Sequence, residues 1–266
     1  MNDRLGETHP DLFRNTHGGG PSCVPLVHLQ DDAGTDPASQ NHTGPKKPNS
    51  RNPARREAVI ARDTLFTLWH DDAYHLVSEN YSYKTESYYT ILRHEMEGRT
   101  VRPSSASVLD AYVVPICLER ARLAGIPVCE WGISQGYAPL PSLVYGLNYF
   151  ATTSDYSVVR DHENAKEVIK HITNKGKYPF CYQKLDEGAG LGSCVSIFGK
   201  TAGDCMGTTE IARRVYELFA IPLVTVVFVR YGDRYLLSSL SPTRYSALST
   251  DERTLLSAYL AHQEFL

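Results

Sequence analysis

The fold is decided by residues 223–240, which read Leu-Val-Thr-Val-Val-Phe-Val-Arg-Tyr-Gly-Asp-Arg-Tyr-Leu-Leu-Ser-Ser-Leu. Two apolar runs, 223–230 and 235–240, surround a short connection that contains Gly232 and Asp233. Runs rich in β-branched and aromatic residues around such a turn are typical of a β-hairpin. Downstream, Ser249-x-x-Glu252 forms a capping box, which marks the start of a helix. We therefore predict a C-terminal β-hairpin followed by a helix.

Upstream of the hairpin, helical and extended patterns alternate. Strands are expected at 74–78, 99–102 and 126–133, and residues 142–147 are another apolar run. Two more strands flank the glycine-rich segment 186–192, which we expect to be a hairpin loop. Helices are expected at 85–97, from the serines at 104–107, at 115–124, after Asp161 and at 209–219. This alternation predicts an α+β (or α/β) fold, with a mixed sheet and packed helices.

The N-terminal part has a different composition. Between Gln30 and Glu57 there is no Val, Ile, Leu, Met, Phe, Trp, Tyr or Cys, so this stretch cannot bury enough apolar area to offset the entropy of ordering it. We predict a disordered, flexible tail at 1–57 and a single α+β domain at 58–266. The apolar segment 23–29 could dock as an edge strand or bind a partner, but a weakly ordered tail is the interpretation we favour. The basic residues at 46–56 indicate nuclear import, nucleic-acid binding or a solvated linker, and we favour the linker because no aromatic residues are interleaved for stacking.

Composition excludes several classes of function. The formal net charge of −3 gives no global field that would attract nucleic acid or anionic lipid. No run of about 18 apolar residues could span a membrane, and no apolar segment follows Met1 as in a secretory signal. The six cysteines have no Cys-x-x-Cys spacing, which favours reduced thiols and a cytoplasmic location. The oligomeric state stays open.

Three motifs resemble ligand sites but lack an essential part. Gly199-Lys200-Thr201 resembles the end of a P-loop, but Cys194 stands where that loop needs its first glycine. The glycines of 188–192 precede a strand pattern rather than the helix of a dinucleotide site. The histidines are dispersed, and His70 and His75 on a strand would point to both faces. We therefore predict no metal and no cofactor.

Two stretches carry a family resemblance. The first is Asn80-Tyr81-Ser82-Tyr83-Lys84-Thr85-Glu86-Ser87-Tyr88-Tyr89, continuing to Arg102-Pro103-Ser104, and the second runs from Val195 through 212–223 and 236–242 to Arg253. Together they resemble the RimK-like ATP-grasp N-terminal domain family, over about residues 74–115 and 193–262. The resemblance implies an α+β domain that is usually fused ahead of an ATP-grasp ligase. Because this chain ends at Leu266, it implies a free-standing version or one half of a split system.

An ATP-grasp ligase needs a strand lysine near the phosphates and a late acidic–Asn pair that holds Mg²⁺. The two candidate places in this chain are Val144-Tyr145-Gly146 and residues 237–242, Leu-Ser-Ser-Leu-Ser-Pro. The first offers no lysine and the second no carboxylate, although Mg²⁺ prefers carboxylate and phosphate oxygens. An active ligase is therefore not the interpretation we favour.

We expect a non-catalytic accessory protein that recognises a substrate or partner for a separately encoded, amide-forming RimK-type ATP-grasp ligase. A tyrosine offers a large contact area with a polar tip, and an arginine can hold a carboxylate in a forked hydrogen bond. We expect a carboxylate-bearing peptide or amino acid to bind between Arg102 and the helix start at 104–107. Core packing is the alternative for the aromatic residues, and we favour it for Tyr88. The predicted binding surface consists of Tyr81, Tyr83, Tyr89, Arg99, Arg102 and Ser104.

Two other classes of function stay open. One is an enzyme, either a cryptic or degenerate ATP-grasp ligase or a peptide-modifying transferase. Its site would lie near Cys129, Glu130, His171, Asp186 and Glu187. The other is a structural interaction module, such as a homodimer formed through the hairpin. Nucleotide binding separates the enzyme from the accessory protein.

Overall fold

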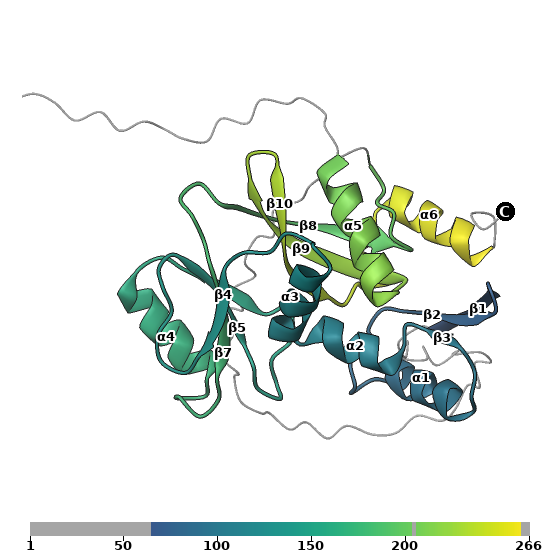
Figure 1. Ribbon diagram of the computed structural model, residues 1–266, viewed down its shortest axis with the longest axis horizontal. Helices are drawn as coiled ribbons and strands as arrows, with labels where there is room; N and C mark the ends of the chain where they lie inside the picture. Colours follow the sequence, from purple (N-terminus) through teal and green to yellow (C-terminus); the bar gives the residue numbers. More distant parts are fainter. Residues whose placement is uncertain (1–64, 204–205, 262–266) are drawn as a thin grey trace, which may run out of the picture.

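The computed structural model describes residues 65–203 and 206–261, and these residues form three β-sheets packed with six α-helices (Figure 1). This confirms the predicted α+β class. The tail expected at 1–57, with its apolar and basic segments, and the domain start expected at 58 lie outside the described residues. No helix in the described part of the chain is long and apolar enough to cross a membrane.

The predicted hairpin is confirmed as strands β9 and β10, Leu223–Tyr231 and Arg234–Ser241. Strand β8, Gly190–Ile197, pairs with the other edge of β9, so β9 is the central strand of the antiparallel sheet β10-β9-β8. Val226 of β9 belongs to one core cluster and Val229 to another. Because β9 is buried on both faces, its sequence is a nearly continuous apolar run rather than an alternating one.

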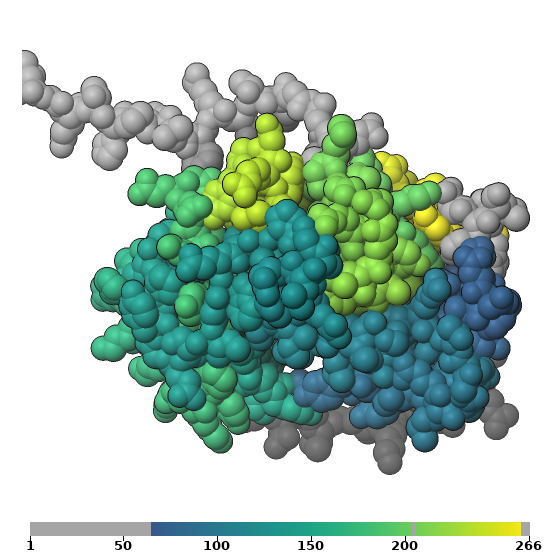
Figure 2. All heavy atoms as spheres, viewed as in Figure 1, coloured from purple at the N-terminus to yellow at the C-terminus, as the bar shows by residue number. Residues whose placement is uncertain are grey.

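One core lies between this sheet and several helices. Ile91 of α1, Val108 of α2 and Phe219 of α5 are all buried in it. On the face shown in Figure 2, α5 and the segment that contains α2 and α3 lie in direct contact. The four helices are α1 (Glu86–Met96), α2 (Ser105–Tyr112), α3 (Val114–Leu123) and α5 (Met206–Phe219).

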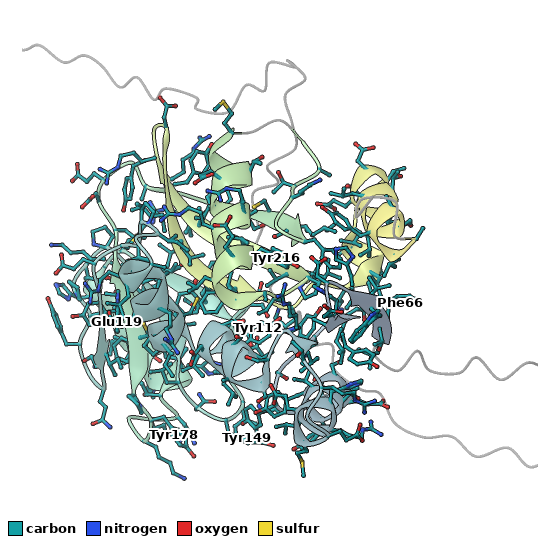
Figure 3. All side chains as sticks on the ribbon, turned by 45° about the vertical axis from the view of Figure 1, so that its right-hand side comes forward. Phe66, Tyr112, Glu119, Tyr149, Tyr178 and Tyr216 are labelled. Carbon is teal, nitrogen blue, oxygen red and sulfur yellow. The ribbon has the colours of Figure 1, made fainter. Side chains whose placement is uncertain are left out.

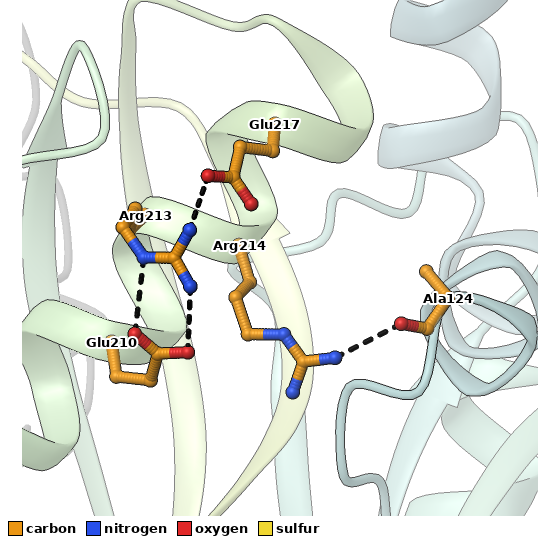
Figure 4. Close-up of polar contacts among 5 residues, drawn as sticks. All are labelled: Ala124, Glu210, Arg213, Arg214 and Glu217. Carbon is orange, nitrogen blue, oxygen red and sulfur yellow. Dashed lines mark hydrogen bonds and ion pairs between the residues drawn. The ribbon is translucent and has the colours of Figure 1, made fainter.

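A polar contact also joins α5 to α3 (Figure 4). Arg214 Nη2 donates a hydrogen bond over 2.9 Å to the carbonyl of Ala124, the C-cap of α3. This bond satisfies one of the acceptors that a helix C-terminus leaves unpaired. The adjacent Arg213 contacts Glu210 and Glu217 of its own helix instead, at an exposed position where such pairs contribute little to stability.

The second sheet is antiparallel and has the order β4-β7-β5-β6. Helix α4 covers one face, where Ala165 and Ile169 pack with Val144 and Phe180. The opposite face packs against α3 and the hairpin sheet. The five elements are β4 (Trp131–Ser134), β5 (Ser142–Gly146), β6 (Tyr156–Val159), α4 (His162–Ile172) and β7 (Phe180–Lys184).

The third sheet consists of β1 (Leu65–His70), β2 (Ala73–Ser78) and β3 (Val101–Arg102). Strand β1 is antiparallel to β2, and β3 is parallel to it. This sheet shares a core with α6, Thr250–Leu260, in which the rings of Phe198 and Tyr259 stack with centroids 4.5 Å apart. The capping box predicted for α6 is confirmed.

Several predicted elements differ from the structure. The glycine-rich segment is not a hairpin loop, because β7 and β8 belong to different sheets and the chain crosses between them there. Of the strand predicted at 126–133, only β4 from Trp131 onward is formed, and Val128 makes a single bridge to Leu237. Helix α5 begins at Met206 rather than at 209. Strands β1 and β6 were not predicted.

Candidate functional site

Four exposed side chains from two loops form a surface that we call the aromatic patch: Tyr83, Lys84, Tyr149 and Phe150. Tyr83, Tyr149 and Phe150 are 42%, 60% and 79% exposed. The Lys84 ammonium donates a hydrogen bond to the Tyr149 carbonyl and lies 4.0 Å from the centroid of the Tyr149 ring. The ring centroids of Tyr83 and Tyr149 are 6.3 Å apart. Figure 3 places Tyr149 at the surface, close to α1.

Side-chain hydrogen bonds hold both loops of the aromatic patch in place. Between β2 and α1, Asn80 Oδ1 accepts a hydrogen bond from the Ser82 backbone N–H at 2.9 Å. After β5, Asn148 Oδ1 accepts from the N–H groups of Phe150 and Ala151, and its Nδ2 donates to the Ile172 carbonyl at 2.8 Å. Such asparagine turns fix the local backbone. The exposed rings are therefore carried on ordered loops.

Of the predicted tyrosines, Tyr81 does not belong to a binding surface. Its ring is completely buried, and its hydroxyl accepts a hydrogen bond from the Ser78 N–H and donates one to the Leu76 carbonyl. Burial raises the pKa of this hydroxyl well above its ordinary value. Tyr88 is also buried, as favoured from the sequence, whereas Tyr89 is 61% exposed on α1. The prediction that Tyr81 belongs to the binding surface is therefore wrong, because its ring is part of the hydrophobic core.

The predicted arginines lie away from the aromatic patch. Tyr83 precedes the N-terminus of α1 and Arg99 follows its C-terminus, so about 16 Å of helix separates the two backbones. Arg99 is paired with Glu97, and its guanidinium lies 5.5 Å from the Tyr74 ring. Arg102 is exposed on β3, where its partner in the strand register is His75. The structure thus divides the predicted surface between the two ends of α1.

The helix start expected to hold a ligand carboxylate already holds one from the chain itself. Glu95 accepts hydrogen bonds from the Ser105 N–H at 2.9 Å and from the Ser105 hydroxyl at 2.6 Å. Ser104, the N-cap of α2, accepts from the Ser107 N–H at 3.0 Å. These contacts satisfy donors that a helix N-terminus leaves free. A carboxylate-bearing ligand remains a prediction, but neither of these N–H groups is available to it.

The two segments compared with the ATP-grasp requirements lie against each other. Tyr145 of β5 is buried, and its hydroxyl lies 2.8 Å from Ser238 Oγ and donates to Ser239 Oγ at 3.1 Å on β10. Gln183 of β7 is also buried, and its Nε2 donates to the Ser238 carbonyl at 2.9 Å. Burial raises the pKa of Tyr145 above its ordinary range. The junction between the two sheets therefore contains neutral hydroxyl and amide groups.

The residues considered for an enzyme are only partly brought together. Cys129 and Asp186 both interact with Tyr231, whose hydroxyl accepts a hydrogen bond from the Asp186 N–H at 2.9 Å. His171 is exposed near the end of α4. Cys129 is 5% exposed, and burial raises the pKa of its thiol to about 11, with Asp186 contributing. A thiol in this environment is a poor nucleophile at neutral pH, because the reactive form is the thiolate.

The other sequence motifs have structural explanations. Helix α5 begins at Met206, six residues after Lys200, so the lysine does not open a helix as it would in a P-loop. Gly190 and Gly192 belong to strand β8, and a side chain at Gly192 would collide with the Phe228 ring. Among the described residues, no group of three His, Cys, Asp or Glu side chains is placed to hold a metal ion.

Sequence reasoning missed Tyr149 and Phe150. The available signal was Asn148-Tyr149-Phe150 directly after an apolar run, since asparagine favours turns and connecting segments lie at the surface. It also missed a pocket of about 470 Å³ beside α4, whose lining comes from segments more than 20 residues apart.

No protein-family model matches the chain, and no curated protein matches it. Solved structures do match. D-alanine–D-alanine ligase from Bacillus anthracis is 10% identical, with 63% of this chain and 70% of that chain covered and a TM-score of 0.50. A RimK domain ATP-grasp protein from Sphaerobacter thermophilus is 16% identical, with 65% and 77% covered and a TM-score of 0.49.

A third similar structure is the ATP-grasp ligase PsnB, complexed with a phosphomimetic variant of its minimal precursor, Mg and ADP. It is 16% identical, with a TM-score of 0.46, and the match covers 64% of each chain. The structural neighbours of this chain thus include ATP-grasp ligases. At these sequence identities, what they share with it is the fold.

Proposed function

We propose that this chain is a non-catalytic accessory protein of an amide-forming ATP-grasp ligase system, which binds a substrate or partner and does not turn over ATP. The observation that carries the proposal is the contact between Tyr145 and the serines at 238 and 239. It fills the junction between β5 and β10 with neutral side chains. The fold neighbours support the ligase context, and this contact supports the absence of catalysis.

An enzyme that transfers phosphoryl groups needs positive charge near the phosphates. The side chains of the Tyr145 contact carry no positive charge. An ATP-grasp site holds a lysine ammonium near the phosphates, whereas the Tyr145 phenol is neutral, and burial raises its pKa still further above neutral pH. Mg²⁺ binding requires oxygen ligands with negative charge, and Ser238 and Ser239 supply only hydroxyls. Because Tyr145 is buried, a nucleotide could reach this junction only if the two sheets moved apart.

The aromatic patch is the binding surface that we propose for the accessory role. Exposed aromatic rings are enriched in protein interfaces, because they bury a large area at a low cost in conformational entropy. Lys84 uses one of its three donors on the Tyr149 carbonyl and is exposed, so its other donors can reach an acceptor on the partner. An exposed lysine among aromatic rings suits a partner that presents a carboxylate beside an apolar group.

The proposed absence of ATP turnover is tested by thermal unfolding of the full chain with 5 mM Mg-ATP and with Mg²⁺ alone, together with an assay of ATP hydrolysis. We expect the same unfolding temperature in both solutions and no hydrolysis. A nucleotide present at 100 times its dissociation constant would add about 2.7 kcal/mol of stability, which such a measurement resolves. A reproducible upward shift with Mg-ATP only, or measurable ADP release, would favour the degenerate-ligase alternative.

The proposed role of the aromatic patch in partner binding is tested with an ATP-grasp ligase from the same genome, immobilised on a sensor surface. The full chain should bind it, and the double variant Tyr149→Ser/Phe150→Ser should bind at least about tenfold more weakly, because two hot-spot side chains are removed. Met96→Ser is the matched control, since Met96 is an exposed apolar residue outside the aromatic patch. Equal binding of the double variant and the parent would exclude the aromatic patch as the interface.

A further inference from the structure

A basic pocket lies on the four-stranded sheet's outer side, away from the Tyr145 contact. Its volume is about 470 Å³, within the range of small-ligand sites. Helix α4 forms one wall, and the segments 135–138 and 173–176 form the others. Ala138, Ala165 and Ile169 are buried and supply an apolar floor. The basic residues of the lining are His162, Lys166, Lys170 and Lys175, and no Asp or Glu is among the lining residues.

The basic side chains form a row along the pocket rather than a single cluster. His162, Lys166 and Lys170 follow one another at four-residue intervals on α4, so they share one face of the helix. Eight residues of helix span about 12 Å. Lys175 extends the row beyond the end of α4, in a turn in which the Gly176 N–H donates to Thr173 Oγ1 at 2.8 Å. The row is therefore longer than a single phosphate or carboxylate group.

The acidic residues near the pocket neutralise only part of this charge. Glu167 lies 3.6 Å from Lys170 on the exposed side of α4. Asp161 caps the helix by accepting from the Asn164 N–H, and it does not line the pocket. Within the described ranges, 65–203 and 206–261, no ion pair is found for Lys166 or Lys175. The pocket therefore keeps a positive surface over an apolar floor.

We propose that this pocket binds an extended acidic peptide segment, with two or more of its carboxylates on the lysines of α4 and the turn. An extended chain places alternate side chains about 6.5–7 Å apart. Residues four positions apart on α4 are separated by about 6 Å along the helix axis, which is close to that spacing. The apolar floor can accept the methylene groups of Glu side chains. Tyr137, which is 64% exposed, forms the outer rim and adds aromatic contact area. This site goes beyond the aromatic patch and does not depend on it.

The test uses the full chain and a fluorescently labelled peptide, Gly-Glu-Gly-Glu-Gly-Glu, followed by fluorescence anisotropy at low salt. We expect binding that weakens as salt is added, because exposed charges are screened. The Gln counterpart of the peptide should bind at least about tenfold more weakly. The double variant Lys166→Glu/Lys170→Glu should lower the affinity for the Glu peptide at least about tenfold, and Lys166→Arg/Lys170→Arg should retain it.

Lys177→Glu is the matched control, because Lys177 is an exposed lysine close to the pocket but outside its lining. Its affinity for the peptide should stay within about twofold of the parent. Absence of binding to the parent chain, equal binding of the Gln peptide, or equal affinity of the folded Lys166→Glu/Lys170→Glu variant would each overturn the proposal. Full displacement of the peptide by an equimolar amount of inorganic pyrophosphate would also overturn it, in favour of a phosphate ligand. None of these outcomes bears on ATP turnover or on the aromatic patch.

Discussion

The Tyr145 hydroxyl lies 2.8 Å from the Ser238 hydroxyl and thereby joins β5 of the four-stranded sheet to β10 of the hairpin sheet. The same hydroxyl also contacts Ser239, although adjacent residues of a regular strand point to opposite faces. The register between β9 and β10 shifts between Leu237 and Ser239, which leaves Ser238 as the bulged residue. A β-bulge redirects side chains in this way, so the bulge allows both serines to reach Tyr145.

The first prediction concerns this contact. Tyr145→Phe should lower the free energy of unfolding by about 1–2 kcal/mol, because the two buried serine hydroxyls each lose a hydrogen-bond partner. Denaturant unfolding measures the loss. Tyr137→Phe is the control, since the Tyr137 ring is mostly exposed and its change should have no measurable effect. Equal stability of the Tyr145→Phe variant and the parent would mean that the contact does not hold the sheets together.

Local sequence patterns predicted the elements that contain their own boundary signals. The hairpin turn at Gly232, the capping box at Ser249 and the cap at Asp161 each lie within a few residues of the element that they define. Strand β4 was misjudged because the pairing of Trp131 with Gln183 depends on residues about 50 positions apart. The same reason explains the error at the glycine-rich segment, where the partner strands lie in different sheets.

The candidate site was less predictable than the fold. A tyrosine-rich run identifies residues that are large and amphipathic, but it does not say which ring faces the core. Tyr81 and Tyr83 are two positions apart, yet the first is buried and the second is exposed. The partners Tyr149 and Lys84 come from loops 65 residues apart, so only the tertiary structure could bring them together.

The second prediction concerns the close approach of β8 to the core. A Cβ at Gly192 would lie 2.7 Å from the Phe228 ring, which is buried and cannot move freely. Gly192→Ala should therefore lower the free energy of unfolding by about 1–3 kcal/mol, as overpacked core sites do. Gly190→Ala is a control on the same strand, because the nearest atom to a Cβ there is 3.8 Å away. Equal stability of the two variants would show that the Phe228 ring does not pack closely against Gly192.

The third prediction concerns the carboxylate at the start of α2. Glu95→Ala should cost about 1–2 kcal/mol in thermal or denaturant unfolding, because the Ser105 N–H and hydroxyl lose a charged acceptor at a helix N-terminus. Glu97→Ala should cost less than about 1 kcal/mol, since the ion pair of Glu97 with Arg99 is exposed. An equal loss in both variants would show that Glu95 acts as a surface charge and not as a cap.

The fourth prediction concerns pH. Burial lowers the pKa of His75 below its ordinary value of 6.5, and the electrostatic effects of Arg102 and His70 lower it further. A backbone hydrogen bond with His70 and the Asp71 carboxylate have smaller, opposite effects. Below about pH 6.5 the unfolded chain therefore binds a proton that the folded chain does not, so the free energy of unfolding should fall as the pH falls, by at most about 1.4 kcal/mol per pH unit. His75→Gln should flatten this dependence between pH 7 and pH 5 in denaturant unfolding. His94, whose pKa is also lowered by burial and by Arg99, keeps a residual slope in the His75→Gln variant. A slope that is the same in the His75→Gln variant and in the parent would mean that His75 gains its proton equally in the folded and unfolded chains.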